Sequence, residues 1–343
     1  MNDHISYAMR NEEAIKSWLS FNSPSELIDW SHLAIELIIY VGLILAFAHA
    51  WRSYKRSGSP SALLTLLAAF LYGLVMDILS YYTVENFWHG EFTIMLLFNK
   101  LPFYIACFYP ALIYHAVMTI RRYDFSRVVE ALSTGFFIAF LYMIFDNLGP
   151  MLGWWIWDTT DPTTFPYVSS VPLTSYAWMF LFTSAFTYIN SKISWDWIAS
   201  DESKWKIILA HVVQPIITIF MGVLLFIPRN LFARNTPPWD LLPWDTNPEM
   251  GAFVYLIMFS LGGWLFLIKW RKPQVERDVL LMIFPFIYLT GLAYIFIAKF
   301  HLFFIVTSEG LSQGLAVGNL LVVVLALIVS ATILLLSHPV PKD

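Results

Sequence analysis

The chain contains few charged residues and one cysteine. Charged residues make up 13% of its 343 residues and hydrophobic residues 58%, whereas an ordinary soluble domain carries about 25% charged residues. A soluble fold cannot cover that much apolar surface, so the composition predicts an integral membrane protein. Because Cys107 stands alone, an intramolecular disulfide and a cysteine-based metal cluster are excluded.

Several motifs with a known chemistry are also missing. The eight histidines are scattered singly, unlike the His clusters of membrane di-iron oxygenases or the His-Glu-x-x-His of zinc proteases. There is no Gly-x-Ser-x-Gly turn, no glycine-rich phosphate loop and no aspartate-rich motif for magnesium and diphosphate. With a net charge of -4 and no basic run, nucleic acid is not an expected partner. We therefore expect no metal and no cofactor, and chemistry by acidic and basic side chains.

What the chain has instead is a series of long apolar segments. About 20 apolar residues cross a hydrocarbon core about 30 Å thick. The sequence therefore predicts an all-α bundle of about nine transmembrane helices in one membrane domain, residues 29–343, preceded by a polar segment, residues 1–28. The expected helices are 32–51, 60–84, 96–120, 127–149, 174–193, 204–227, 250–270, 279–306 and 313–337.

Lys and Arg occur in alternate connections between these segments. The connections after the first, third, fifth and seventh helices carry them, for example at Arg52, Arg121, Lys204 and Lys269, and those after the second, fourth and eighth carry none. The connection after the sixth carries Arg229 and Arg234, which are offset by Asp240, Asp245 and Glu249. Because basic loops favour the cytoplasmic side, we expect the N-terminus outside and the C-terminus in the cytoplasm. The expected location is the plasma (inner) membrane, with multiple passes.

Two stretches of the chain share a pattern. An aspartate lies deep in an apolar segment, a tryptophan follows eleven residues later, and an aliphatic-proline pair opens the next apolar segment. The spacing predicts a parallel internal repeat of residues 60–120 and 127–193, which pairs the second and third helices with the fourth and fifth. The two copies are Asp77, Trp88 and Leu101-Pro102, and Asp146, Trp157 and Val171-Pro172.

Polar residues gather near the outer ends of the expected helices. An acid within a membrane segment is by default a functional-site hypothesis, and an unpaired charge at the bilayer centre costs roughly 2.5 to 3.5 kcal/mol. We therefore expect Asp77, Asp146 and Glu36 to be catalytic and to share one polar cavity with Lys100, Lys299 and His301 nearby. Structural salt bridges or side chains that extend to the interface are the alternative for Glu36, Lys100 and Lys299. The inner half holds fewer polar candidates, namely His115, Glu130, His211 and Gln214.

Carboxylic acids among many aromatic side chains suit the protonation of an isoprenoid alkene. A carboxyl group in a poorly solvated site stays protonated, and Asp146 or Asp77 is the expected proton donor. The 15 Trp, 17 Tyr and 29 Phe residues offer ring faces that stabilise a carbocation by about 0.5 to 2 kcal/mol each. The second carboxylate would orient water or accept the final proton.

The run Asp146 to Pro150, followed by Trp155-Ile156-Trp157, Tyr167, Val171-Pro172 and Trp178, resembles a pattern in membrane carotenoid-biosynthesis proteins of the bisanhydrobacterioruberin and carotenoid hydratase type. The resemblance covers roughly residues 70–185. It implies a multi-pass enzyme that hydrates or isomerises a double bond of an isoprenoid lipid in the bilayer without a metal, with Asp146 as donor and Asp77 as partner. The expected substrate-binding residues are Trp88, Glu91, Asn99, Lys100, Asn147, Trp155, Trp157, Tyr167, Trp178, Lys299 and His301.

The main alternative is a proton-coupled secondary transporter, in which Asp77, Asp146 and Lys299 form a relay. Internal repeats are common in transporters too. Against this alternative, the polar residues thin out toward the inner side, so the sequence predicts no polar path across the bilayer. A third interpretation is a binding or assembly protein without catalysis.

Overall fold

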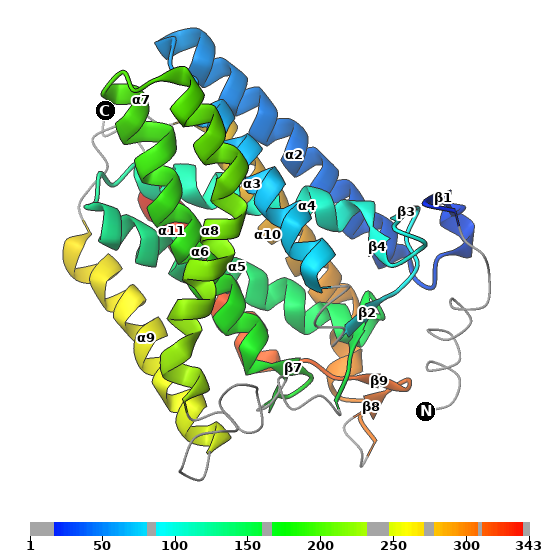
Figure 1. The fold of residues 1–343 in the computed structure, drawn as a ribbon. Coiled ribbons are helices and arrows are strands. Elements are labelled where there is room, and N and C mark those ends of the chain that lie inside the picture. Colours follow the sequence, from blue (N-terminus) through cyan, green and yellow to red (C-terminus); the bar gives the residue numbers. More distant parts are fainter. Residues whose placement is uncertain are drawn as a thin grey trace, which may run out of the picture.

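The computed structural model describes residues 17–80, 87–159, 167–231, 247–270, 278–307 and 311–338. Within these residues nine long helices form a bundle (Figure 1), one for each predicted apolar segment. They are α2 Trp30–Ser57, α3 Ser61–Leu79, α4 Phe103–Arg121, α5 Arg127–Leu152, α6 Leu173–Ser191, α8 Lys204–Asn230, α9 Pro248–Lys269, α10 Val279–Ala298 and α11 Leu320–Ser337. Of these, α4 and α11 begin seven residues later than expected and α10 ends eight residues earlier. The short helical segments are η1 Pro24–Glu26, η4 Lys192–Asp196, α7 Trp197–Ala199 and η6 Phe300–Phe303.

Eight of the nine long helices are long and apolar enough to cross a membrane. The exception is α6, which has 19 residues and includes several Ser, Thr and Tyr side chains. Nearly all of α6 is buried, because it packs against α5 on one side and α8 on the other. A helix that faces protein rather than lipid tolerates polar side chains, which can bond to neighbouring helices. The helical, multi-pass fold is thus confirmed.

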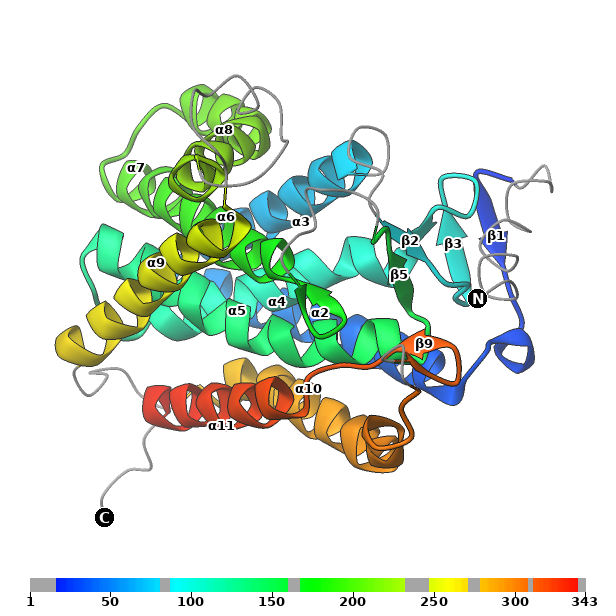
Figure 2. The ribbon, with the colours of Figure 1, turned by 90° about the horizontal axis from the view of Figure 1, so that it is seen from below.

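The centre of the bundle is formed by α4 and α5. In Figure 2, α3 and α8 lie on one side of this pair and α10 and α11 on the other. The contacts agree with this view: α3 packs on α4 and α8, α11 packs on α5, and α2 packs on α4 and α10. The main hydrophobic core extends through all of these helices.

The strands of the described residues lie at one end of the bundle (Figure 1). Three antiparallel pairs are hairpins that close within one connection, whereas β1–β3 and the β2–β5 ribbon each join two segments that are far apart in sequence. The strands are β1 Leu19–Phe21, β2 Phe87–His89, β3 Ile94–Leu96, β4 Leu101–Pro102, β5 Trp155–Trp157, β6 Tyr167–Val168, β7 Val171–Pro172, β8 Leu311–Ser312 and β9 Leu315–Ala316. The pairs are β1 with β3, β3 with β4, β2 with β5, β6 with β7, and β8 with β9.

The two copies of the aspartate-tryptophan-proline pattern form similar local structures. Pro102 precedes the first residue of α4 and Pro172 that of α6, with φ and ψ of -62° and 135° at the first and -60° and 132° at the second. Each proline ends a hairpin, which is β3–β4 in one copy and β6–β7 in the other. Proline is accepted at the start of a helix because its missing N–H has no partner to lose there.

The connections with basic residues lie at the end of the bundle away from the strands. Arg52 belongs to the last turns of α2, Arg121 to the last turn of α4 and Lys204 to the first turn of α8. We call this end the inner end and the strand end the outer end. The described chain starts at the outer end and α11 finishes at the inner end (Figure 1). Residues 1–16 of the polar N-terminal segment lie outside the described residues, as do Arg271, Lys272 and Arg277.

Candidate functional site

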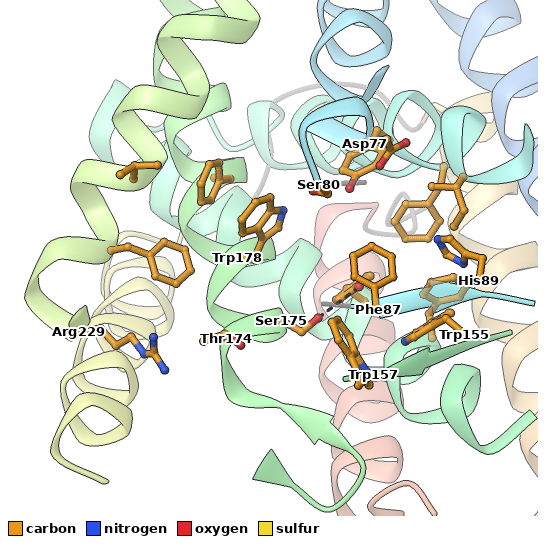
Figure 3. A pocket seen from close by; sticks show the side chains of 18 of the residues that line it. Asp77, Ser80, Phe87, His89, Trp155, Trp157, Thr174, Ser175, Trp178 and Arg229 are labelled. Carbon is orange, nitrogen blue, oxygen red and sulfur yellow. Dashed lines mark hydrogen bonds between the residues drawn. The ribbon is translucent and has the colours of Figure 1, made fainter. Parts of the chain in front are cut away.

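A cavity of about 290 Å³ lies at the outer end of the bundle. Its wall is built by α3, α4, α5, α6, α8 and the β2–β5 ribbon (Figure 3). Most of the wall is aromatic, and the polar groups are spread over several elements. The aromatic residues are Phe87, Phe108, Tyr109, Tyr142, Phe145, Trp155, Trp157, Trp178, Phe182 and Phe226, and the other polar ones are Asp77, Ser80, His89, Thr174, Ser175, Arg229 and Asn230.

The β2–β5 ribbon supplies one face of the cavity. Successive side chains of a strand point to opposite faces, so Phe87 and His89 turn toward the cavity while Trp88 lies on the other face and is 48% exposed. In the facing strand, Trp155 and Trp157 take the same orientation. The antiparallel register places Phe87 opposite Trp157 and His89 opposite Trp155.

Two of the aromatic rings in the cavity wall pack directly against glycines. A Cβ atom added to Gly149 of α5 would lie 2.1 Å from the ring of Trp155, and one added to Gly222 of α8 would lie 2.4 Å from the ring of Phe182. Such distances are far below contact distance, so each ring occupies the space of a missing side chain. Phe182 is in turn stacked on Trp178, with ring centroids 4.3 Å apart. The aromatic wall is therefore held in place by the helix sequences.

Asp77 is the acid that lines the cavity. It lies near the end of α3, and only 4% of the residue is exposed. The hydroxyl of Tyr109 on α4 hydrogen-bonds its carboxyl group, and its Oδ2 atom has no hydrogen-bond partner among the described residues. Gly73, one turn earlier on α3, lets Tyr109 approach, since a Cβ there would lie 2.5 Å from the Cβ of Tyr109. Asp77 thus places a buried carboxyl oxygen, unpaired among the described residues, at the cavity wall.

Asp146 lies behind the cavity wall. It is completely buried, and neither carboxyl oxygen has a hydrogen-bond partner in the part of the chain that the structure describes. Ser175, which interacts with the Asp146 carboxyl, and Tyr142 line the cavity in its place. The Ser175 hydroxyl donates a hydrogen bond of 3.3 Å to the Tyr142 hydroxyl. The two aspartates of the repeated pattern are therefore in different environments.

Glu36 has a structural partner instead of facing the cavity. One of its carboxyl oxygens accepts hydrogen bonds from the backbone N–H and the hydroxyl of Thr93, at 3.1 and 3.0 Å. A third bond of 3.4 Å comes from Tyr40. These contacts tie α2 to the loop before β3.

The expected common polar cavity does not form among the described residues. Lys299 pairs with Asp29 at 2.5 Å, and Asn99 bonds to Ser20. Lys100 and His301 are exposed. The prediction placed these residues inside helices, but Asn99 and Lys100 lie in the turn between β3 and β4, and Lys299 and His301 follow the end of α10.

Of the remaining expected substrate-binding residues, some line the cavity and others do not. Trp155, Trp157 and Trp178 line the cavity. Asn147 does not, because it donates to the Tyr176 hydroxyl at 2.6 Å and accepts from the backbone N–H of Asn319 at 2.8 Å. Tyr167, which donates to the Asp158 carbonyl at 3.4 Å, and Glu91 lie outside the lining, as does Trp88.

Most of the cavity wall was not predicted, including its two basic residues, His89 and Arg229. His89 shares a hydrogen bond of 3.3 Å with the Trp154 carbonyl through Nδ1, and burial lowers the pKa of its imidazole to about 3, so it is neutral at neutral pH. Arg229 of α8 is buried and donates to Asn230 at 3.0 Å. Strand alternation would have identified His89, because it follows the outward-facing Trp88. No sequence pattern indicates that Arg229 lines a site, because it lies at the end of an expected helix, where a basic loop residue is ordinary.

Comparisons with known proteins identify the family but no activity. Residues 12–232 match the family described as "Domain of unknown function (DUF7802)", and since this is more than half of the chain, the protein belongs to that family. No curated protein and no solved structure matches the chain. The matched segment includes every residue that lines the cavity. No group of three or more His, Cys, Asp or Glu side chains that could hold a metal ion is found where the structure describes the chain.

Proposed function

We propose that this member of the family is a membrane enzyme that protonates a C=C bond of an isoprenoid or carotenoid-like lipid, followed by hydration, isomerisation or cyclisation. The observation that carries the proposal is the placement of Asp77. Its buried carboxyl group lines a cavity whose wall is mostly aromatic, and one of its oxygens is not used by the described residues. A carboxyl group in such surroundings favours its protonated form, because burial disfavours charge.

The proton donor in this proposal is Asp77, with Tyr109 as its orienting partner. Asp77 transfers its proton to one carbon of the double bond, and the other carbon becomes a tertiary cation. The faces of Phe87, Trp157 and Trp178 stabilise that cation by about 0.5 to 2 kcal/mol each. They offer no lone pair that would trap it.

The step that ends the reaction needs a proton acceptor. His89 is neutral and lies on the same face of the ribbon as Phe87. It accepts the proton that a water loses on adding to the cation, or the proton that the cation itself loses in an isomerisation. Asp146 acts as a positioning residue through Ser175 and Tyr142, so its role differs from the direct donation that the sequence resemblance implies.

A long lipid chain can reach this cavity from the bilayer. Val223 of α8 lines the cavity and is 49% exposed, so the cavity is open beside α8. A cavity of about 290 Å³ holds the reacting end of an isoprenoid, while the rest of the chain extends past α8 into lipid.

The same proposal includes the arrangement in the membrane. The basic residues at the inner end support an outer N-terminus and a cytoplasmic C-terminus in the plasma membrane. The matching hairpin, proline and helix starts at Pro102 and Pro172 support the internal repeat. The resemblance to carotenoid hydratases supports the substrate class.

Heavy-oxygen water tests this function. Purified protein in lipid is incubated with lycopene-like and shorter polyprenyl substrates, and the products are analysed by mass spectrometry. A hydratase incorporates the heavy oxygen, an isomerase or cyclase converts the substrate without it, and the Asp77→Asn variant does neither. If no isoprenoid is converted and the protein instead drives solute uptake into vesicles on a pH gradient, the proposal is wrong.

A proton-coupled transporter is the second candidate, and one observation favours it. Polar side chains continue inward from the cavity between α6 and α8, where Thr187, Thr218 and Gln214 are completely buried. The sequence alone predicts no such path.

A further inference from the structure

We propose that a water-containing path between α3, α6 and α8 carries protons from the inner end of the bundle to Asp77. We call this set of residues the inner path: Thr187, Asn190, Ser194, His211, Gln214 and Thr218. The inference rests on the proposed function, since it supplies the proton that Asp77 gives to the substrate. It adds a direction from which the proton arrives and the residues that conduct it.

The register of α6 against α8 brings these residues together. The two helices are antiparallel, with Phe182 packed on Gly222 at the outer end and Ser194 hydrogen-bonded to His211 at 2.8 Å at the inner end. Between these two contacts, Thr187 of α6 lies at the depth of Thr218 on α8. On α8, the inner-path residues are spaced three or four apart, which places them on one helix face.

The middle of the inner path has polar groups without partners. Gln214, Thr218 and Thr187 are each 0% exposed. Neither the amide oxygen nor the amide nitrogen of Gln214 has a hydrogen-bond partner among the described residues, and the same holds for both threonine hydroxyls. Buried polar groups in native proteins are nearly always hydrogen-bonded, and internal water provides the bonds where protein does not. We therefore place water molecules beside these three side chains.

The inner end of the path is a continuous chain of hydrogen bonds. Ser194 donates to the Asn190 amide oxygen at 2.7 Å, and the Asn190 amide nitrogen donates to the Thr65 hydroxyl on α3 at 3.0 Å. His211, two turns into α8, has its Nε2 atom 2.8 Å from the Ser194 hydroxyl and its Nδ1 atom 2.7 Å from the Ile207 carbonyl, so the Ser194 proton is shared between Asn190 and His211. The His211 imidazole and the Ser194 hydroxyl can exchange a proton with each other and with internal water, whereas Asn190 holds the Ser194 side chain in place.

The outer end of the path lies beside Tyr72, which packs close to the cavity acid. The Tyr72 ring lies 5.7 Å from the ring of Phe186 on α6 and 5.9 Å from that of Tyr109, measured between centroids. The Tyr72 hydroxyl also interacts electrostatically with the Asp77 carboxyl. Tyr72 therefore lies near both the outer end of the path and Asp77, and in this proposal internal water completes the path between them. After each turnover one proton enters along the path to Asp77, and the proton accepted by His89 leaves at the outer end.

Infrared spectroscopy of the substrate-free protein tests the inner path. The full chain is reconstituted in lipid and transferred rapidly into deuterium oxide, and the shift of the protonated carboxyl band that Asp77→Asn removes is followed in time. We expect Gln214→Leu and Thr218→Val to slow this exchange by about ten-fold, the effect of one lost hydrogen bond of ordinary strength on a barrier. Thr290→Val is the matched control, because Thr290 is exposed on α10 and its substitution should leave the rate unchanged.

The outcomes separate the inner path from the proposed function. If both inner-path variants exchange as fast as the unaltered protein, the path is wrong, whatever the isoprenoid assay gives. If they exchange slowly but no isoprenoid is converted, the path stands and the enzymatic proposal is wrong. Thr218→Val keeps the side-chain shape, so it answers the question even if Gln214→Leu does not fold.

Discussion

Phe87 and Trp157 face each other across the β2–β5 ribbon, with ring centroids 5.3 Å apart, and both rings line the cavity. The pair joins the two stretches that share the aspartate-tryptophan-proline pattern. Trp88, the tryptophan of the first stretch, faces away from the cavity, whereas Trp157 of the second faces into it. The two stretches therefore contribute different side chains to one site.

Removal of one cation-facing ring should slow the reaction without unfolding the protein. We expect Phe87→Leu and Trp157→Leu each to lower kcat by about two-fold to thirty-fold, because a cation-π contact of about 0.5 to 2 kcal/mol is lost from the transition state. The turnover of the isoprenoid substrate measures the effect. Trp88→Leu, on the opposite face of β2, is the control and should retain full activity. Equal losses in all three variants would mean that the ribbon matters for folding only.

A side chain added at Gly149, against which the Trp155 ring packs, should disturb the cavity. In Gly149→Ala the new methyl group would lie 2.1 Å from that ring, and overpacking of this kind destabilises a protein by about 1 to 3 kcal/mol. A lower thermal midpoint and a loss of activity are expected. Gly291→Ala on α10 is the control, because its nearest neighbour is the Cδ1 end of the Ile38 side chain at 2.5 Å, which can rotate away. An unchanged midpoint for Gly149→Ala would contradict the packing described here.

Asn147 should act on stability rather than on catalysis. Asn147→Leu removes its bonds to Tyr176 and to the backbone of Asn319, and leaves buried polar groups unpaired at a cost of about 1 to 3 kcal/mol. The free energy of unfolding in denaturant should fall by that amount, while the turnover per folded molecule stays the same. A large fall in turnover with unchanged stability would contradict this prediction and indicate that Asn147 binds the substrate.

The sequence was sufficient to predict the helices but not their rotation. Long apolar runs identify the nine segments, and Pro172 identifies the start of α6 although that helix is less apolar than the others. The depth of Asp77 and Asp146 was predicted from their distance to the helix ends. Which of the two faces the cavity depends on the angle about the helix axis, and small shifts of packing decide it.

Strand alternation and tertiary pairing explain the other differences. The recurrence of tryptophan in the repeated pattern indicates Trp88 as a site residue. In the strand Phe87–His89, however, alternation turns Phe87 and His89 toward the cavity and Trp88 away from it. The partner of Glu36 is Thr93, which is far away in sequence, so no local sequence pattern predicts this hydrogen bond. For the same reason the pairing of Lys299 with Asp29 was not predictable.

The stability of the protein should depend on pH through His89. Its pKa in the folded protein is about 3, against an ordinary value of 6.5, so below about pH 6.5 the unfolded chain binds a proton that the native protein does not. Stability is therefore lost as the pH falls, by about 2 kcal/mol from this group near pH 5. We expect His89→Gln to lose less stability than the unaltered protein between about pH 7 and about pH 5, as measured by denaturation in detergent. Parallel losses in the two proteins would show that His89 is not held neutral.

Transfer of deuterium from solvent to substrate tests the central claim most directly. In deuterium oxide, the unaltered protein should place one deuteron on a carbon of the isoprenoid product. Asp77→Asn preserves the shape of the side chain and should lower this transfer by about 10² to 10⁴, the usual contribution of a general acid. Asp146→Asn should keep this transfer within about ten-fold, since the Asp146 carboxyl group lies behind Ser175 and Tyr142 and does not line the cavity. Undiminished transfer by Asp77→Asn would contradict the account.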